Sequence, residues 1–298
     1  MMNRRQFLAR SALFGSAAWL TTLGAPGKLL AATAQGKPLG IQLYMVLKAY
    51  QDDPLGTLKT LKAIGYTEIE AIVTSTAKTL RDQLNETGLR SPSMHFDSLG
   101  FEPGIEAAHV LGAQFIVSSM LPEIMKKEQA AKGKSAPDPT YSLDEAKRTA
   151  EYANHLGEKA KQAGLQYAYH NHHLEFTDVG GGQTFYDVLL KETDHKLVQF
   201  EMDCGWVHAG GKNPADYFKA NPGRIPLMHA KDFLPGANDK NNFPGAELGH
   251  GTLDYKPIMA AAEASGLKHC FVEQEGPYAR MSQLDAARVD FAYLRPLR

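Results

Sequence analysis

Val198-Gln-Phe-Glu-Met-Asp-Cys-Gly-Trp-Val-His208 is the stretch that decides the fold. Its first half alternates apolar and polar residues, as a β-strand with one face in a core does. Cys204 and Gly205 then break this alternation, so that Asp203 stands at the carboxyl end of the strand. A carboxylate near a core needs a cation, a hydrogen-bond network or a metal ion. The stretch therefore predicts a strand that delivers an acidic side chain to a site.

Three other predicted strands end in the same way. They are 167–170, 227–229 and 271–273, which finish on His170, His229 and Glu273. Histidine and glutamate are common metal ligands. One such ending carries little information, but four in the second half of one chain indicate a shared site.

Strands and helices alternate from residue 39 to the end of the chain. The predicted strands are 39–44, 67–71, 91–95, 114–118, 165–170, 198–203, 225–231 and 269–274. Eight strand–helix units in about this length fit a closed (β/α)₈ barrel. An open doubly wound sheet normally carries a glycine-rich turn after its first strand, and none follows Tyr44. The pattern therefore predicts a single α/β domain, a (β/α)₈ TIM barrel over residues 37–298.

Helix start and stop signals separate these strands. The predicted helices are 54–64, 79–85, 105–111, 142–163, 184–191, 214–220, 257–265 and 283–294. Ser142 and Glu145 form a capping box for the longest of them. Two long connections remain, 120–141 and 232–254, and the first is expected to be a functional loop rather than a linker.

The first 34 residues have the three parts of a twin-arginine signal peptide. Arg4-Arg5 precedes an apolar run, 12–23, that is too short to span a bilayer, and Ala32-Thr-Ala34 is a small-x-small cleavage site. We therefore expect export to the periplasm by the twin-arginine pathway. After cleavage of residues 1–34, no membrane attachment is expected.

Composition excludes several classes of protein. The chain has 298 residues, a formal net charge of −1 and 43% hydrophobic residues, which is typical of a globular protein. Near-neutral charge leaves no electrostatic footprint for nucleic acid, so no nucleic-acid partner is expected. The two cysteines, Cys204 and Cys270, are predicted to be buried thiols rather than a disulfide.

The residues at the strand ends are of the types that bind a divalent metal ion. A barrel gathers the carboxyl ends of its strands around one mouth, so His170, Asp203, His229 and Glu273 should converge. Mixed carboxylate and imidazole donors suit Mn²⁺, Mg²⁺, Co²⁺ or Zn²⁺ better than copper. Glu70 and His95 end the second and third strands and should face the same mouth, as should the other candidates. These are Lys231, which could balance charge or stabilise an oxyanion, Trp206 at the rim, and His250 in a glycine-rich loop.

Several runs together resemble a known family. They are 40–44, 65–70, 169–172 with Glu175-Phe176, 201–206, 229–232, 249–254 and 272–274. With them the chain resembles the xylose isomerase-like TIM barrel superfamily, and within it the sugar phosphate isomerase/epimerase group. The resemblance covers the whole chain after the signal peptide. It implies one divalent ion held by strands five to eight, with Asp203, His229 and Glu273 as ligands.

Strand five departs from the family pattern. Related epimerases have a glutamate where this chain has His170. Either His170 replaces that ligand, or Glu175 swings in and frees His170 or His172 to act as a base. We favour Glu175, because a third anionic ligand suits Mn²⁺ or Mg²⁺ better than a second neutral imidazole.

Such a site would work on sugars. A metal ion can chelate a carbonyl and its neighbouring hydroxyl, and a histidine or Glu70 can then remove the α-proton. Reprotonation gives isomerisation or epimerisation, which is the predicted function, with His170, His172, Lys231 and Glu70 as catalytic residues and His95, Trp206 and His250 as substrate-binding residues.

Two alternatives remain open. Loss of a β-substituent from the same intermediate would make the protein an exported 3-keto-glycoside lyase. A barrel without metal would be an exported sugar-binding protein. The expected partner is in each case a small-molecule sugar or glycoside, and a homo-oligomer is compatible with the sequence. DNA cleavage is disfavoured, because Trp206 stands where apurinic endonucleases, which share this barrel, have a zinc-binding histidine.

Overall fold

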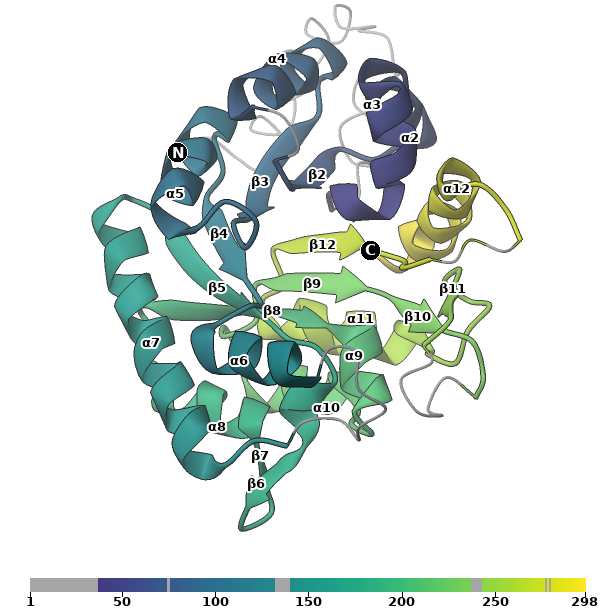
Figure 1. The fold of residues 1–298 in the computed structure, drawn as a ribbon. Coiled ribbons are helices and arrows are strands. Elements are labelled where there is room, and N and C mark those ends of the chain that lie inside the picture. The colour runs from purple at the N-terminus through teal and green to yellow at the C-terminus, as the bar shows by residue number, and fades with distance from the viewer. Residues whose placement is uncertain (1–36, 74–75, 132–139, 237–242, 277, 279) are drawn as a thin grey trace, which may run out of the picture. The chain divides into compact units, whose positions relative to one another are not determined.

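Eight parallel strands close on themselves into a barrel in the computed structural model of the protein (Figure 1). Around the barrel they follow the order β1-β12-β9-β8-β5-β4-β3-β2. Their bounds are β1 (Gly40–Gln42), β2 (Glu68–Ala71), β3 (Arg90–His95), β4 (Phe115–Ser118), β5 (Gln166–His170), β8 (Val198–Asp203), β9 (Leu227–Ala230) and β12 (His269–Val272). The predicted fold is thus confirmed, and all eight predicted strands are present with ends shifted by at most a few residues.

The structure describes residues 37–73, 76–131, 140–236, 243–276, 278 and 280–298. Residues 38–298 form one compact unit. The predicted signal peptide and its cleavage site lie outside the described residues. Within the described part of the chain, no helix has both the length and the apolar character needed to cross a membrane.

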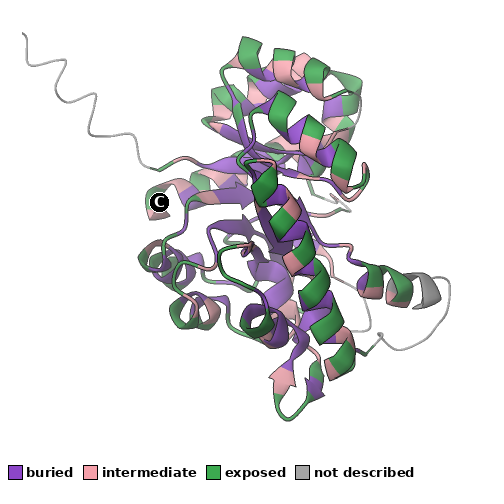
Figure 2. Ribbon diagram, turned by 90° about the vertical axis from the view of Figure 1, so that its left-hand side faces the viewer, coloured by how far each residue is buried: buried purple, intermediate pink, exposed green. Residues whose placement is uncertain are grey.

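Helices cover the outside of the barrel. They are α3 (Pro54–Ile64), α4 (Ala77–Thr87), α5 (Phe101–Leu111), α7 (Leu143–Gln162), α8 (Phe185–Glu192), α10 (Pro214–Ala220), α11 (Tyr255–Ser265) and α12 (Gln283–Leu294). Ser142 and Glu145 form the predicted capping box at the start of α7. Each helix buries one face against the strands and exposes the other, as the colours of Figure 2 show.

Several short elements were not predicted. The 3₁₀ turn η1 (Leu43–Val46) and helix α2 (Leu47–Asp52) follow β1 directly, and α9 (Cys204–Ala209) follows β8. The connection 120–141, expected to be a loop, contains helix α6 (Pro122–Ala131), and 232–254 contains the hairpin of β10 (Asp232–Phe233) and β11 (Gly245–Ala246). A second hairpin joins β6 (Asp178–Gly180) and β7 (Gln183–Thr184). Apart from α6, which has ten residues, these segments are too short to show a clear periodicity.

The two faces of each barrel strand have different surroundings. Outward residues such as Ile69, Met94 and Met228 join the large core beneath the helices. Inside the barrel, a smaller cluster that we call the apolar layer consists of Phe115, Val117, Ala168, Leu227 and Phe271. Gly40 is required beside it, because a Cβ atom there would lie 2.4 Å from Cδ1 of Phe271. Cys204 and Cys270 are buried free thiols, as predicted.

Candidate functional site

Charged side chains follow the apolar layer toward the carboxyl ends of the strands. Successive inward side chains of a strand are two residues apart. The pairs are Ala168 and His170 on β5, Leu227 and His229 on β9, and Phe271 and Glu273 at the end of β12. All three ligand-type residues are buried, so the strands bring the predicted residues into one interior space.

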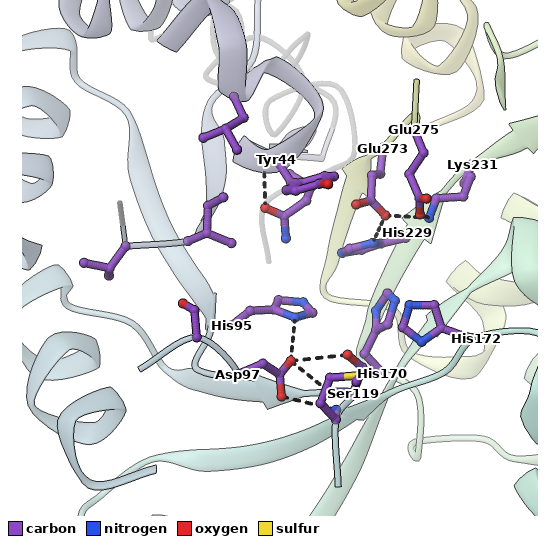
Figure 3. A pocket seen from close by; sticks show the side chains of 16 residues that line it. Tyr44, His95, Asp97, Ser119, His170, His172, His229, Lys231, Glu273 and Glu275 are labelled. Carbon is purple, nitrogen blue, oxygen red and sulfur yellow. Dashed lines mark hydrogen bonds and ion pairs between the residues drawn. The ribbon is translucent and has the colours of Figure 1, made fainter. Parts of the chain in front are cut away.

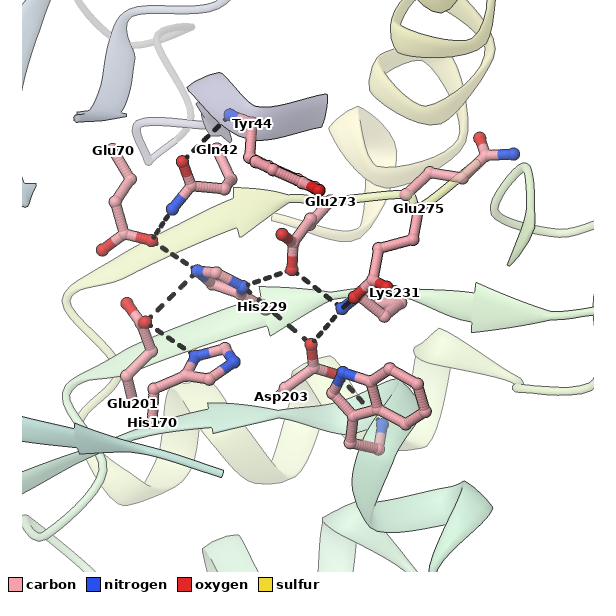
Figure 4. Close-up of polar contacts among 12 residues, drawn as sticks. Gln42, Tyr44, Glu70, His170, Glu201, Asp203, His229, Lys231, Glu273 and Glu275 are labelled. Carbon is pink, nitrogen blue, oxygen red and sulfur yellow. Dashed lines mark hydrogen bonds and ion pairs between the residues drawn. The ribbon is translucent and has the colours of Figure 1, made fainter. Parts of the chain in front are cut away.

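His229 lies at the centre of this space, with carboxylates on both sides of its ring (Figure 4). Its Nδ1 is 2.8 Å from Glu273 Oε2 and 3.9 Å from Asp203 Oδ2. Its Nε2 contacts Glu70 Oε2 and lies 3.3 Å from Glu201 Oε2. Burial alone would lower the pKa of His229, but Glu201, Glu273 and Glu70 outweigh burial and raise this pKa well above its ordinary value.

On one side, four residues form what we call the imidazole group: His95, His170, Glu201 and His229. Glu201 Oε2 lies 2.9 Å from His95 Nε2 and 2.9 Å from His170 Nδ1. Burial, together with the neighbouring Glu70, raises the pKa of Glu201 to about 7. Each residue offers one ligand atom, and these atoms all lie within 4.8 Å of one another.

Glu201 is a residue of the site to which the sequence patterns assigned no role, although it lies in the run 201–206 that resembles the family. It stands two residues before the end of its strand, so a search for strand ends passes over it. The parallel register pairs Glu201 with His170, the last residue of β5. The stagger of barrel strands therefore brings Glu201 level with a neighbouring strand's end.

On the other side lies the carboxylate group: Asp203, His229 and Glu273. Lys231 Nζ sits between its carboxylates, 2.9 Å from Asp203 Oδ2 and 2.9 Å from Glu273 Oε2, and 2.7 Å from Glu275 Oε1. Burial alone would lower the pKa of Lys231, but the three carboxylates raise it well above its ordinary value. These oxygens therefore already bind a cation.

The turn after β8 fixes the direction of Asp203. Its Oδ1 accepts a hydrogen bond from the backbone N–H of Trp206 at 2.9 Å and so caps helix α9. The Trp206 ring lies under Lys231, with the Nζ atom 4.9 Å from the ring centroid. Trp206 is buried rather than at the rim, and it does not line the cavity described next.

A cavity of about 540 Å³ opens above these groups (Figure 3). Six of the predicted site residues line it: His95, His170, His172, His229, Lys231 and Glu273. Asp97, which the sequence did not single out, also lines it and lies 3.7 Å from His95 Nδ1. The backbone N–H groups of Ser119 and Met120 hold the Asp97 carboxylate.

The histidines of the cavity differ in protonation. Burial lowers the pKa of His172 to about 3, and among the described residues its Nδ1 has no hydrogen-bond partner. Burial also lowers the pKa of His170, whose Nδ1 is engaged with Glu201. For His95, Glu70 and its hydrogen-bonding carboxylate neighbours outweigh burial and raise the pKa well above its ordinary value. The cavity is thus lined by two neutral imidazoles, His170 and His172, and by two imidazoles that favour the charged form, His95 and His229.

Glu70, predicted to be catalytic, is buried and does not line the cavity. It accepts hydrogen bonds from Ser93 Oγ and, at 2.9 Å, from Gln42 Nε2, besides its contact with His229. Burial would raise the pKa of Glu70, but His95 and His229 hold it well below its ordinary value. Glu70 therefore supports the ring of His229 as a fixed negative charge.

The structure does not bring two predicted residues to the site. Glu175, in the 3₁₀ turn η2 (Leu174–Phe176), accepts hydrogen bonds from Tyr169 Oη at 2.6 Å and from the His172 backbone N–H at 3.1 Å. Because Tyr169 alternates with His170, it points out of the barrel and holds Glu175 there. His250 is exposed and does not line the cavity. His170, rather than Glu175, therefore lies among the ligand-type residues.

We next compared the sequence with known protein families and characterised relatives. The sequence model of the xylose isomerase-like TIM barrel family matches residues 58–297. An inosose dehydratase of Lacticaseibacillus casei is 31% identical over 179 residues, which cover 53% of this chain and 56% of that protein. The chain thus aligns with only about half the length of this curated relative.

Solved structures share the fold at low sequence identity. A sugar phosphate isomerase/epimerase from Parabacteroides distasonis is 23% identical with a TM-score of 0.72, and the match covers 89% of this chain and 97% of that one. The IOLI protein with a zinc atom is 16% identical with a TM-score of 0.64, over 87% and 97% of the two chains. A 3-keto-D-glucoside 4-epimerase from E. coli is 18% identical with a TM-score of 0.60, over 88% and 100%. At these identities the structures show the fold alone; the family match over most of the sequence shows that the chain belongs to the xylose isomerase-like TIM barrel family.

Proposed function

We propose that the protein is a divalent-metal-dependent enzyme that removes the proton next to the carbonyl of a keto-sugar or keto-cyclitol. The observation that carries this proposal is the cavity itself, where buried carboxylate and imidazole donors meet neutral and charged histidines. Asp203, His229 and Glu273 would hold the ion, with His170 of the adjoining imidazole group as a further donor. The ammonium of Lys231 between Asp203 and Glu273 supports the fit, because these carboxylates already favour a cation.

A bound divalent ion polarises a carbonyl oxygen and so acidifies the adjacent C–H bond. Mn²⁺, Mg²⁺, Co²⁺ and Zn²⁺ all suit this donor set. Lys231 supplies a fixed positive charge beside the same cavity, which would stabilise an oxyanion formed when the α-proton leaves.

His172 is the best-suited base. It lines the cavity, and burial lowers its pKa so that the imidazole is neutral at pH 7. His170 also lines the cavity, but we assign it to the ion as a further donor, so the role of base falls to His172. The charged His95 lines the same cavity and is suited to give a proton to a leaving oxygen.

A base and an acid in one cavity favour elimination. The base takes the α-proton, the C–O bond at the β-carbon breaks, and the acid protonates the departing oxygen. The name of the relatives, inosose dehydratase, describes such a loss of water. Isomerisation or epimerisation is the second candidate, favoured by the names of the structural neighbours, and it shares the first proton transfer.

Proton exchange in D₂O tests the proposal. The purified protein, loaded in turn with Mn²⁺, Co²⁺ or Zn²⁺, is incubated with inososes and 3-keto-glucosides and followed by NMR. We expect exchange of the α-proton, its loss on chelation, and its loss in His172→Gln with metal content unchanged. Binding of these sugars without any exchange would instead support the sugar-binding alternative and refute the proposed chemistry.

We further propose that residues 1–34 direct export by the twin-arginine pathway to the periplasm. The support is the Arg4-Arg5 pair with its apolar run and cleavage site. Lys substitution of both arginines should leave the precursor uncleaved in the cytoplasm, with the single Arg10→Lys variant as control. Unchanged export of the double variant would refute the proposal.

A further inference from the structure

A second cavity adjoins the first. It has a volume of about 320 Å³, and Tyr44 and Leu47 line both cavities. Glu273 lines the first cavity, and the next residue, Gln274, lines the second. One strand end therefore supplies a wall to each, and a ligand longer than one ring could reach from the charged cavity into the second.

Tyr44 stands at the junction of the two cavities. Its side chain is 53% exposed, the largest exposure among the large hydrophobic residues that the structure describes. An exposed aromatic ring in a cavity wall suits the apolar C–H face of a sugar ring. Figure 3 shows Tyr44 at the end of the pocket where Glu273 lies.

The position of Tyr44 is tied to the charged site through Gln42. Gln42 Oε1 accepts a hydrogen bond from the Tyr44 backbone N–H at 3.1 Å, and Gln42 Nε2 donates to Glu70 Oε2 at 2.9 Å (Figure 4). Gln42 is itself buried. The exposed ring is therefore anchored to the residues that surround His229.

Gln274 points to a ligand with a hydroxyl group. Its side chain is only 2% exposed, and among the described residues its Oε1 has no hydrogen-bond partner. A buried acceptor without a partner costs about 1–3 kcal/mol. Its backbone carbonyl is fixed by Tyr278 Oη at 2.5 Å. Because Gln274 lines the second cavity, we assign a ligand hydroxyl there as the partner of Oε1.

The charges of the second cavity favour a neutral ligand. Lys48 is the charged residue among its lining residues, and its Nζ lies 2.5 Å from the carboxylate of Asp52. The remaining polar side chains are the amides of Gln51, Gln274 and Gln283 and the phenols of Tyr44 and Tyr278. Such a lining suits hydroxyl groups better than a phosphate, which needs unpaired positive charge.

We propose that the second cavity is a subsite for the second ring of a glycoside. The reacting ring would lie in the charged cavity, and the second ring would stack on Tyr44 and donate a hydroxyl to Gln274 Oε1. This inference rests on the proposed function and narrows its substrate class to neutral two-ring glycosides, rather than free or phosphorylated monosaccharides.

Calorimetry with unreactive sugars tests the subsite without turnover. The probes are cellobiose, maltose, trehalose and sucrose, each compared with methyl glucoside. We expect at least one disaccharide to bind at least tenfold more tightly than methyl glucoside. The Tyr44→Ala and Gln274→Leu variants should each reduce that ratio to about one, whereas Tyr152→Ala, which removes a similarly exposed tyrosine from α7, should keep it.

Thermal unfolding separates binding from a structural role. Gln274→Leu removes an unsatisfied buried acceptor, so its Tm should equal or exceed that of the parent protein while the affinity ratio falls. A lower Tm, with the ratio retained, would mean that Gln274 serves the fold, and the proposal would fail. It would also fail if no disaccharide bound better than methyl glucoside, or if nothing bound.

The outcome is independent of the proposed reaction. Proton exchange on single-ring ketones without any disaccharide preference would leave the proposed function standing and refute the subsite. A disaccharide preference that depends on Tyr44, without proton exchange, would support the subsite and refute the proposed function.

Discussion

Two layers inside the barrel are built from the same strands and have opposite chemistry. The apolar layer holds phenylalanine, valine, alanine and leucine side chains. Two residues further along β5, β9 and β12, the inward positions are His170, His229 and Glu273. The pleat and the parallel pairing continue unchanged from one layer to the next, so only the side chains differ.

The comparison shows where stability and function are separated. Burial of the apolar side chains stabilises the fold by about 25 cal/mol per Å² of apolar surface. Burial of carboxylates costs free energy, and here it is offset by imidazoles and the ammonium of Lys231. We therefore expect substitutions in the apolar layer to change stability, and those in the charged layer to change metal binding and activity.

The largest effect is expected at His229. His229→Ala removes the donor shared by both ligand groups, so bound metal should be lost and turnover should fall by at least about a thousandfold. Metal analysis and proton exchange measure this, and His195→Ala, at an exposed position, is the control. Full metal content in His229→Ala would break the proposed link between this layer and function.

Phe271→Ala tests the other layer. The variant leaves a cavity beneath the site and should lower the free energy of unfolding by about 3–5 kcal/mol, as measured by urea denaturation. Metal content per folded molecule should not change. If the variant lost its metal while its free energy of unfolding stayed the same, the two layers would not have separate roles.

Glu201 should make stability depend on pH. An unfolded glutamate titrates near 4.5, whereas burial and Glu70 raise the pKa of folded Glu201 to about 7. The folded protein thus holds a proton that the unfolded chain releases, so this contribution is complete below pH 4.5 and is lost as the pH rises through 7, by up to about 3 kcal/mol.

The measurement is Tm of the metal-free protein between pH 5 and 8. Glu201→Gln should flatten its decline with rising pH, and Glu158→Gln, on the exposed face of α7, should not. If the decline of Tm with pH were unchanged in Glu201→Gln, ionisation of Glu201 would not be what destabilises the folded protein.

The smallest effect concerns Glu175. Tyr169→Phe removes the hydrogen bond to its carboxylate and should cost about 2 kcal/mol of stability, with metal content unchanged. Glu175→Gln should likewise keep its metal. Loss of metal in either variant would place Glu175 among the ligands, as the sequence had suggested.

Sequence patterns predicted what depends on one strand at a time. Alternation and the final polar residue of each strand located His170, Asp203, His229 and Glu273. Glu201 was missed because its position depends on the stagger between β5 and β8, which no single strand reveals. The assignment of Glu175 as a ligand stays a prediction. The structure places its carboxylate against Tyr169 on the outward face, a hydrogen bond that ligand charge alone does not report.

The apolar layer also determines the route by which substrate enters and product leaves. Because Phe271 packs against Gly40 beneath the charged residues, this end of the barrel offers no passage. Incoming substrate and departing product must share the mouth above His229. Product should therefore compete directly with substrate for the same entrance.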